Sequence, residues 1–189
     1  KMNHFQRFHH PFFDLFGGQF ADFETESDIL INGHLGDQAE VLMKEKDCGN
    51  TTVVVGGGLV GCETALWLAQ QGKDVTIVEA LDKIMKVNGP ICHSNKDMLE
   101  LLLPFHNVEI MTSAKVKGYE NGTLSVETAD GMKELACDSV ILSVGYNEEN
   151  SLYHEVEFEV PEIYLLGDAK KVANIMYAIW DAFEVANHI

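Results

Sequence analysis

The sequence has few basic residues. Only 13 Lys and Arg residues stand against 30 Asp and Glu residues, so the formal net charge is −17. Nucleic-acid binding requires clustered Lys and Arg side chains that neutralise phosphates, and anionic membrane surfaces attract basic segments for the same reason. We therefore expect neither a nucleic acid nor a membrane surface as a partner.

Cysteines are also few, and none of them form a CxxC pair. The spacing of Cys48, Cys62, Cys92 and Cys137 matches neither a zinc site nor a disulfide framework, which indicates a reducing cytoplasm. There is no apolar run of transmembrane length and no signal peptide. The chain opens with Lys1 instead of Met, so we expect a fragment, a processed chain or a trimmed one.

The first 50 residues differ from all that follows. They begin with a stretch rich in Phe and His and end in the polar segment KEKDCGN, which is typical of a linker. Beyond them the patterns predict strands at 51–56, 73–79, 107–111, 139–145 and 161–168, and helices at 59–71, 93–103 and 174–188. Between 115 and 135, Asn121-Gly122 and Asp130-Gly131 predict tight turns of a three-stranded antiparallel meander. The fold class is therefore α/β, a Rossmann-like parallel sheet flanked by helices.

A GxGxxG motif follows the first of these strands and opens a helix. In a dinucleotide-binding fold the first glycine permits a tight turn, the second lets the backbone approach a pyrophosphate, and the third allows close contact between helix and strand. The N–H groups at the helix N-terminus attract the phosphates. We expect the backbone of this turn to bind the pyrophosphate, through Gly56, Gly57, Gly58, Leu59, Val60 and Gly61.

Glu79 ends the second strand, about twenty residues beyond the glycines, where the ribose of the adenosine half lies in such folds. A carboxylate accepts hydrogen bonds from ribose hydroxyls and repels a 2′-phosphate, and neither Ala80 nor the next residues supply an Arg. NAD(H) is therefore favoured over NADP(H), although Lys83 and Lys86 leave a minority case for the latter. The same motif can also hold FAD.

Three segments resemble the C-terminal region of NADH:flavin oxidoreductases of the old-yellow-enzyme group, such as 2-enoate reductase and 2,4-dienoyl-CoA reductase. They are VVVGGGLVGCETALWLAQQGKDVTIVEALDKIM, SVILSVGY and EIYLLGDAKKVANIMYAIWDAFEVA. In that family a barrel with FMN and an iron–sulfur cluster precedes an FAD-binding domain, into which an NAD(H)-binding domain is inserted. The present chain has no cysteine cluster for iron–sulfur, and its first 50 residues lack the FAD domain's own GxGxxG.

The resemblance implies three regions. Residues 1–50 would be a partial FAD-domain remnant with a linker, residues 51–147 an NAD(H)-binding domain like that of pyridine nucleotide-disulfide oxidoreductases, and residues 148–189 the return segment of the FAD domain. It further implies that Gly167 and Asp168 contact FAD, with a local turn and helix cap as the alternative for Asp168. Glu63 would lie near the nicotinamide, or would only favour the helix dipole. Gly145 is expected where the backbone approaches the cofactor.

Other residues favour structural interpretations. His4, His9, His10 and Asp14 have the chemistry of zinc ligands, but their spacing fits no regular site. Cys62 is expected to pack in the core instead of acting in redox chemistry. Trp67 and Trp180 are also expected in the core.

The sequence thus predicts the NADH-binding module of a flavin-dependent oxidoreductase, passing hydride from NADH to a flavin. Its partners would be NADH, the flavin and a missing barrel or FAD domain, or a second copy of the chain. The alternative is a non-catalytic dinucleotide-binding domain or an excised fragment without activity of its own.

Overall fold

The computed structural model of this chain describes residues 35–37, 47–86 and 92–189. These residues divide into two compact units, one ending at Gly145 and the other beginning at Tyr146. The domain boundary that we expected after residue 147 stays a prediction. The candidate metal ligands His4, His9, His10 and Asp14 lie outside the described residues.

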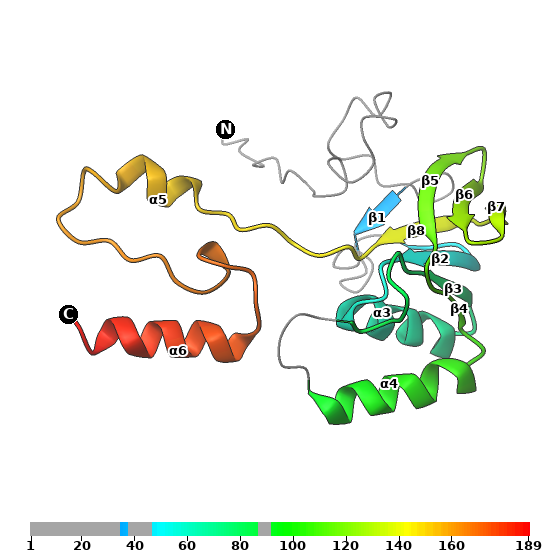
Figure 1. Cartoon of the computed structure of the whole chain (residues 1–189), viewed down its shortest axis with the longest axis horizontal. Coiled ribbons are helices and arrows are strands. Elements are labelled where there is room, and N and C mark those ends of the chain that lie inside the picture. The colour runs from blue at the N-terminus through cyan, green and yellow to red at the C-terminus, as the bar shows by residue number, and fades with distance from the viewer. Residues whose placement is uncertain (1–34, 38–46, 87–91) are drawn as a thin grey trace. The chain divides into compact units, whose positions relative to one another are not determined.

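The first unit is built on a five-stranded parallel sheet (Figure 1). In spatial order its strands are β1 (Leu35–Asp37), β8 (Ser139–Leu142), β2 (Thr51–Val55), β3 (Asp74–Val78) and β4 (Glu109–Met111). The chain runs outward from β2 to β3 and β4, then returns to place β8 on the other side of β2. The strand order therefore reverses between β2 and β8, the point at which open α/β sheets bind their ligands.

Two helices cover one face of this sheet, α3 (Leu59–Gln70) and α4 (His93–Phe105) (Figure 1). Their buried side chains pack against alternate residues of the central strands, including Val54, Ile77 and Ile141. Gly72 adopts a φ of +83° just beyond α3, as expected for the residue that ends a helix. The strand–helix–strand pattern of the sequence is therefore confirmed for this part of the chain.

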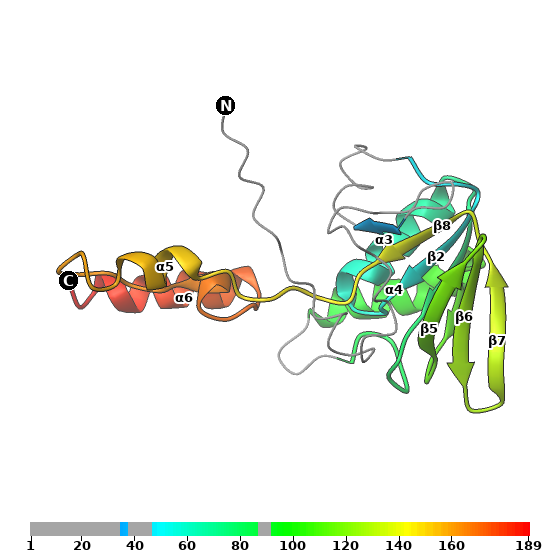
Figure 2. The same cartoon turned by 90° about the horizontal axis from the view of Figure 1, so that it is seen from above.

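An antiparallel meander packs on the opposite face of the sheet (Figure 2). Its strands are β5 (Lys115–Glu120), β6 (Thr123–Thr128) and β7 (Gly131–Ala136). Asn121 and Gly122 form the first turn with φ values of +50° and +80°. The second turn is centred on Ala129 and Asp130, because Gly131 already pairs with Thr128 as the first residue of β7. The predicted meander is thus confirmed, with this turn displaced toward the N-terminus by one position.

The second unit contains α5 (Ser151–Val156), the short 3₁₀ helix η1 (Gly167–Ala169) and α6 (Ile175–Ala186). None of these three elements has a buried residue. The strand predicted at 161–168 is wrong, because a strand needs a neighbour to complete its hydrogen bonds and the described residues of this unit offer none. Trp180 is 56% exposed, so its predicted place in a core is also wrong.

Candidate functional site

The glycine turn lies between the ends of β2 and β8. Gly56 donates its N–H to the carbonyl of Val78 (2.8 Å), and Ser143 donates its own to the carbonyl of Val55 (2.8 Å). Gly56 has a φ of +106°, and a Cβ at this position would lie 2.2 Å from the Ser143 carbonyl oxygen. The fold itself therefore requires glycine at position 56.

Gly61 has a similar internal role on the first turn of α3. A Cβ added there would lie 2.1 Å from the carbonyl oxygen of Gly56 and 3.1 Å from the hydroxyl of Ser143. No side chain fits at such distances. Gly61 thus lets the helix begin in direct contact with the strand that precedes it, which is the part that the motif assigns to its third glycine.

Gly58 differs from both. It is the N-cap of α3 with φ −70° and ψ −179°, an extended conformation that any residue adopts. Apart from its two chain neighbours, no atom of the described residues would lie within 4 Å of a Cβ at this position. Neither backbone strain nor packing among the described residues accounts for a glycine here. Close approach of a ligand to the backbone does account for it, so this turn fits a pyrophosphate.

The start of α3 offers the hydrogen-bond donors that a pyrophosphate needs. Cys62 is the first residue of the helix whose N–H donates a helical hydrogen bond, to the Gly58 carbonyl at 3.0 Å. The amides of Leu59, Val60 and Gly61 precede it in the first turn. No side chain caps this end of α3, and the first turn carries no acidic residue. Its partial positive charge is therefore available to an anion.

Glu79 lies beside the glycine turn, at the end of β3. Its Oε2 accepts a hydrogen bond from the N–H of Gly57 at 2.6 Å, and its Oε1 accepts one from the N–H of Leu81 at 2.7 Å. The side chain is half-buried. The structure thus brings the predicted ribose-binding carboxylate and the predicted pyrophosphate turn into direct contact.

The loop after β3 packs against the same turn. Met85, which is buried and has a φ of +51°, donates its N–H to the Gly57 carbonyl at 2.6 Å. Ile84 places its Cγ2 2.7 Å from where a Cβ of Gly57 would lie. Lys86, one of the two lysines that could favour NADP(H), forms an ion pair with Asp82 at 2.7 Å. Ala80 is exposed at the start of the loop.

Sequence reasoning missed Ser143, Ile84 and Met85 as parts of this site. Ser143 and Met85 act through backbone atoms, which leave no signature in residue type. A small residue after β8 is the one available signal for Ser143. The positive φ of Met85 has no signal at all, because long apolar side chains rarely adopt it.

Three further predicted residues lie around the turn. Glu63 is exposed in the second turn of α3, beyond the first turn in which an acidic side chain acts most on the helix dipole. Gly145 has a φ of +103°, which by itself favours glycine at that position. Cys62 is fully buried, and burial, followed by the charge of Glu79, raises the pKa of its thiol to about 12. This thiol is a packing group, as expected.

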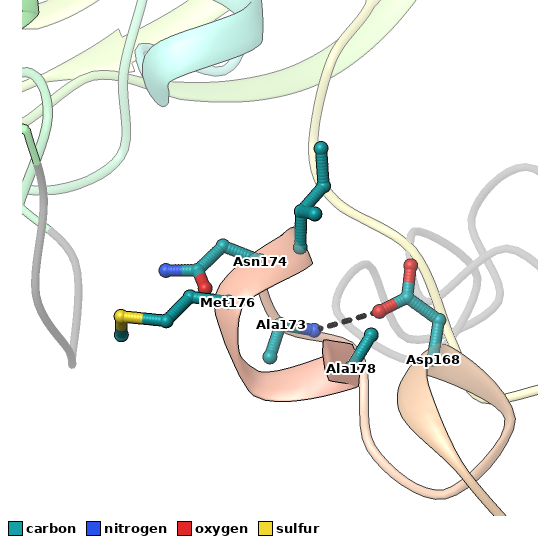
Figure 3. A pocket seen from close by; sticks show the side chains of 6 residues that line it. Asp168, Ala173, Asn174, Met176 and Ala178 are labelled. Carbon is teal, nitrogen blue, oxygen red and sulfur yellow. Dashed lines mark hydrogen bonds between the residues drawn. The ribbon is translucent and has the colours of Figure 1, made fainter. Parts of the chain in front are cut away.

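Asp168 lies in the second unit beside the start of α6 (Figure 3), and Gly167 precedes it in η1. Gly167 has a φ of +57°. Asp168 is exposed, and its Oδ1 accepts the N–H of Ala173 at 3.1 Å. An open groove there is lined by Asp168, Ala173, Asn174, Ile175, Met176 and Ala178. The hydrogen bond to Ala173 is a local turn contact, the alternative role for Asp168. The second carboxylate oxygen of Asp168 faces away from Ala173 (Figure 3).

Within the described part of the chain, no group of three or more His, Cys, Asp or Glu side chains could hold a metal ion. Nor does that part contain a helix long and apolar enough to cross a membrane.

Comparison with known proteins extends these observations. A family model described as pyridine nucleotide-disulphide oxidoreductase matches residues 24–182. The chain is 47% identical over 150 residues to a cinnamate reductase of Clostridium sporogenes, covering 79% of the chain and 23% of that protein. It is 30% identical over 155 residues to a bilirubin reductase of Mediterraneibacter gnavus, covering 82% of the chain and 24% of that protein.

Among solved structures, a 2-naphthoyl-CoA reductase matches with a TM-score of 0.72 and 25% identity, covering 81% of the chain and 23% of that structure. The chain thus spans about a quarter of the length of the relatives it matches. The resemblance to enoate reductases that the sequence motifs indicated is confirmed.

Proposed function

Because this chain belongs to the pyridine nucleotide-disulphide oxidoreductase family, whose members bind NAD(H) and FAD, we propose that residues 51–147 bind NADH and present its nicotinamide to a flavin. The observation that carries this proposal is Gly58, which has no conformational need to be glycine and whose Cβ would meet no atom of the structurally described residues within 4 Å beyond its chain neighbours. A ligand that approaches the backbone supplies the reason.

In this proposal the pyrophosphate lies against Gly58, with the amides of Leu59, Val60 and Gly61 as donors. Gly56 and Gly61 allow α3 to begin in contact with the residue that follows β2, so that these amides lie beside the glycine turn. Such backbone donors bind an anion even in a chain whose formal net charge is −17, because they hydrogen-bond it directly at the helix N-terminus.

Glu79 would bind the hydroxyls of the adenosine ribose. Each of its oxygens already accepts one backbone N–H and retains a second lone pair for a hydroxyl. A 2′-phosphate would bring like charges together at this position. Lys86, which could otherwise pair with a 2′-phosphate, forms an ion pair with Asp82. This further supports NADH over NADPH as the ligand.

When bound, NADH supplies a hydride that reduces the flavin. The chain's own part would be to hold the dinucleotide at the β2–β8 edge, with Glu63 and Gly145 on the side of the nicotinamide. Residues 148–189 would belong to an FAD-binding domain and contribute Gly167 and Asp168. There the second carboxylate oxygen of Asp168 would accept a hydrogen bond from a hydroxyl of the flavin's side chain.

For the whole protein we propose the reduction of an unsaturated or aromatic carboxylic acid or its CoA thioester, since two of the proteins that it resembles are named cinnamate reductase and 2-naphthoyl-CoA reductase. The flavin-bearing remainder of the protein would be the partner that completes the site, and a second copy of the chain is the alternative partner. The four cysteines are free, which supports a cytoplasmic location.

A second candidate function is dinucleotide binding without turnover. It is favoured by the length of the matched region, because the chain spans about a quarter of the length of the cinnamate reductase and of the bilirubin reductase. Both candidates share the NADH site, and they differ only in whether this chain retains a flavin.

The test is a calorimetric titration of the purified chain with NADH and NADPH, combined with its absorbance spectrum. We expect NADH to bind more tightly than NADPH. A flavin spectrum that is bleached by NADH supports the redox module, whereas a colourless protein that binds NADH supports the second candidate. A folded chain that binds neither nucleotide refutes both.

A further inference from the structure

The carboxylate of Glu79 is held in one orientation by two backbone amides. They come from different segments, Gly57 in the glycine turn and Leu81 in the loop after β3. Charge-assisted hydrogen bonds of 2.6 and 2.7 Å are among the stronger polar contacts in proteins. A carboxylate whose sole role is to bind ribose hydroxyls does not need a hydrogen bond to the glycine turn.

Glu79 contacts the N–H of the peptide that precedes the Gly57 Cα, and the peptide that follows this Cα is fixed as well. The Gly57 carbonyl accepts the N–H of Met85 at 2.6 Å, and Ile84 fills the space beside the Gly57 Cα. A trans peptide is planar, so the direction of the Gly57 carbonyl sets the direction of the Gly58 N–H. Glu79 thus fixes the peptide plane before the Gly57 Cα and Met85 fixes the plane after it, so the two together orient the backbone that leads into Gly58.

We propose that Glu79 is a positioning residue for the pyrophosphate turn in addition to its role at the ribose. This inference rests on the proposed function, since it concerns the same dinucleotide site. It states that affinity for the phosphate half of the ligand depends on a carboxylate that does not touch phosphate.

The sign of the effect separates this role from plain electrostatics. Removing a negative charge beside a bound anion strengthens binding of that anion. Removing a group that orients the turn weakens it. If Glu79 served the ribose alone, its removal could only strengthen the binding of a ligand that lacks ribose hydroxyls, through the lost charge.

The experiment measures calorimetric affinity for 2′,3′-dideoxyadenosine 5′-diphosphate, which keeps the adenine and two phosphates but has no ribose hydroxyls. For Glu79→Ala we expect affinity about tenfold weaker than in the unchanged chain, the loss that follows from one charge-assisted contact. The matched control is Asp82→Asn, which also removes a carboxylate from this loop, one that pairs with Lys86 and not with the turn. We expect the control to bind the same ligand as tightly as, or more tightly than, the unchanged chain.

Glu79→Gln keeps the side-chain volume and one of the two hydrogen bonds, so it covers the case in which the alanine variant does not fold. We expect it to bind the dideoxy ligand with intermediate affinity and to exchange its Gly57 amide hydrogen faster than the unchanged chain does. The inference is overturned if Glu79→Gln binds the dideoxy ligand as tightly as the unchanged chain while losing affinity for NADH. An unchanged chain that binds neither NADH nor the dideoxy ligand overturns the proposed function, and this inference with it.

Discussion

A Cβ at Gly61 would lie 2.1 Å from the carbonyl oxygen of Gly56, which places the first turn of α3 in direct contact with the glycine turn. The two glycines are thus required by the folded chain itself, with or without a ligand. Gly58, between them, is not. The three glycines of the motif can therefore be separated by experiment into those that build the site and the one that admits the ligand.

Gly61→Ala should destabilise the fold. The added methyl group overlaps a backbone oxygen that cannot move without shifting β2, and overpacking of this kind lowers the free energy of unfolding by about 1–3 kcal/mol. Urea denaturation followed by circular dichroism measures the change. Gly58→Ala serves as the control, with a change of less than about 1 kcal/mol expected because its methyl group clashes with none of the residues that the structure describes. Equal losses in the two variants would contradict this assignment.

Gly58→Val should leave the chain folded and weaken NADH binding. The extended backbone at this position accepts a β-branched residue, and the valine methyl groups would occupy the space through which the pyrophosphate approaches. We expect at least about a tenfold loss of affinity, equivalent to about 1.4 kcal/mol. Calorimetry with NADH measures it, and undiminished affinity in a folded variant would remove the pyrophosphate from this turn.

Much of the first unit could be predicted from its sequence because local pattern and tertiary structure agree there. The unbroken β-branched run of β2 and the helical spacing of α3 each meet a partner in the same unit. The C-terminal end of β8 was harder to predict from the sequence. It ends at Leu142 and not at Gly145, because the ladder stops where its neighbour β2 stops, at Val55.

Elements that depend on a distant partner could not be predicted in this way. β1 has three residues and exists through its pairing with β8, about a hundred residues later, so it carries no pattern of its own. The segment 161–168 has the composition of a strand, but no strand among the described residues of its unit lies beside it. Strand propensity indicates a suitable surface and not the presence of a neighbour.

The residues of the candidate site show the same difference between features that residue type indicates and features that depend on a distant contact. Residue types at fixed spacing indicated the glycines and Glu79, since those roles depend on a missing side chain or on a carboxylate. The hydrogen bond from Met85 to Gly57 could not be found, because any residue with an N–H can make it. The contact between Glu79 and Gly57 also lay beyond sequence reasoning, which assigned the carboxylate to the ribose alone.

Glu79→Ala should reduce discrimination between the two nicotinamide dinucleotides. The substitution removes hydroxyl acceptors that NADH uses and a charge that opposes the 2′-phosphate of NADPH. We expect the ratio of NADPH to NADH dissociation constants to fall toward one, mainly through weaker binding of NADH. Parallel titrations measure both constants. Unchanged constants for both nucleotides would remove Glu79 from the site.

Cys62 should make the fold less stable in alkali. Burial raises the pKa of its thiol from 9.0 to about 12 in the folded chain, so between these values the unfolded chain ionises and the folded chain does not. The unfolded state then binds fewer protons than the folded state, and the free energy of unfolding falls as the pH rises, by up to about 1.4 kcal/mol per pH unit. This contribution is fully present below pH 9.0.

Cys62→Ala isolates the contribution of this thiol from those of the other groups that titrate in alkali, including Cys137, whose pKa burial raises to about 11. Urea denaturation between about pH 8.5 and pH 10.5 should show a steeper loss of stability for the unchanged chain than for the variant. At neutral pH the variant should be the less stable of the two, because it loses a buried sulfur atom against the glycine turn. The two stability curves should therefore converge as the pH rises. Parallel curves would mean that the Cys62 thiol ionises as readily in the folded chain as in the unfolded one, and that the space behind the glycine turn is open to water.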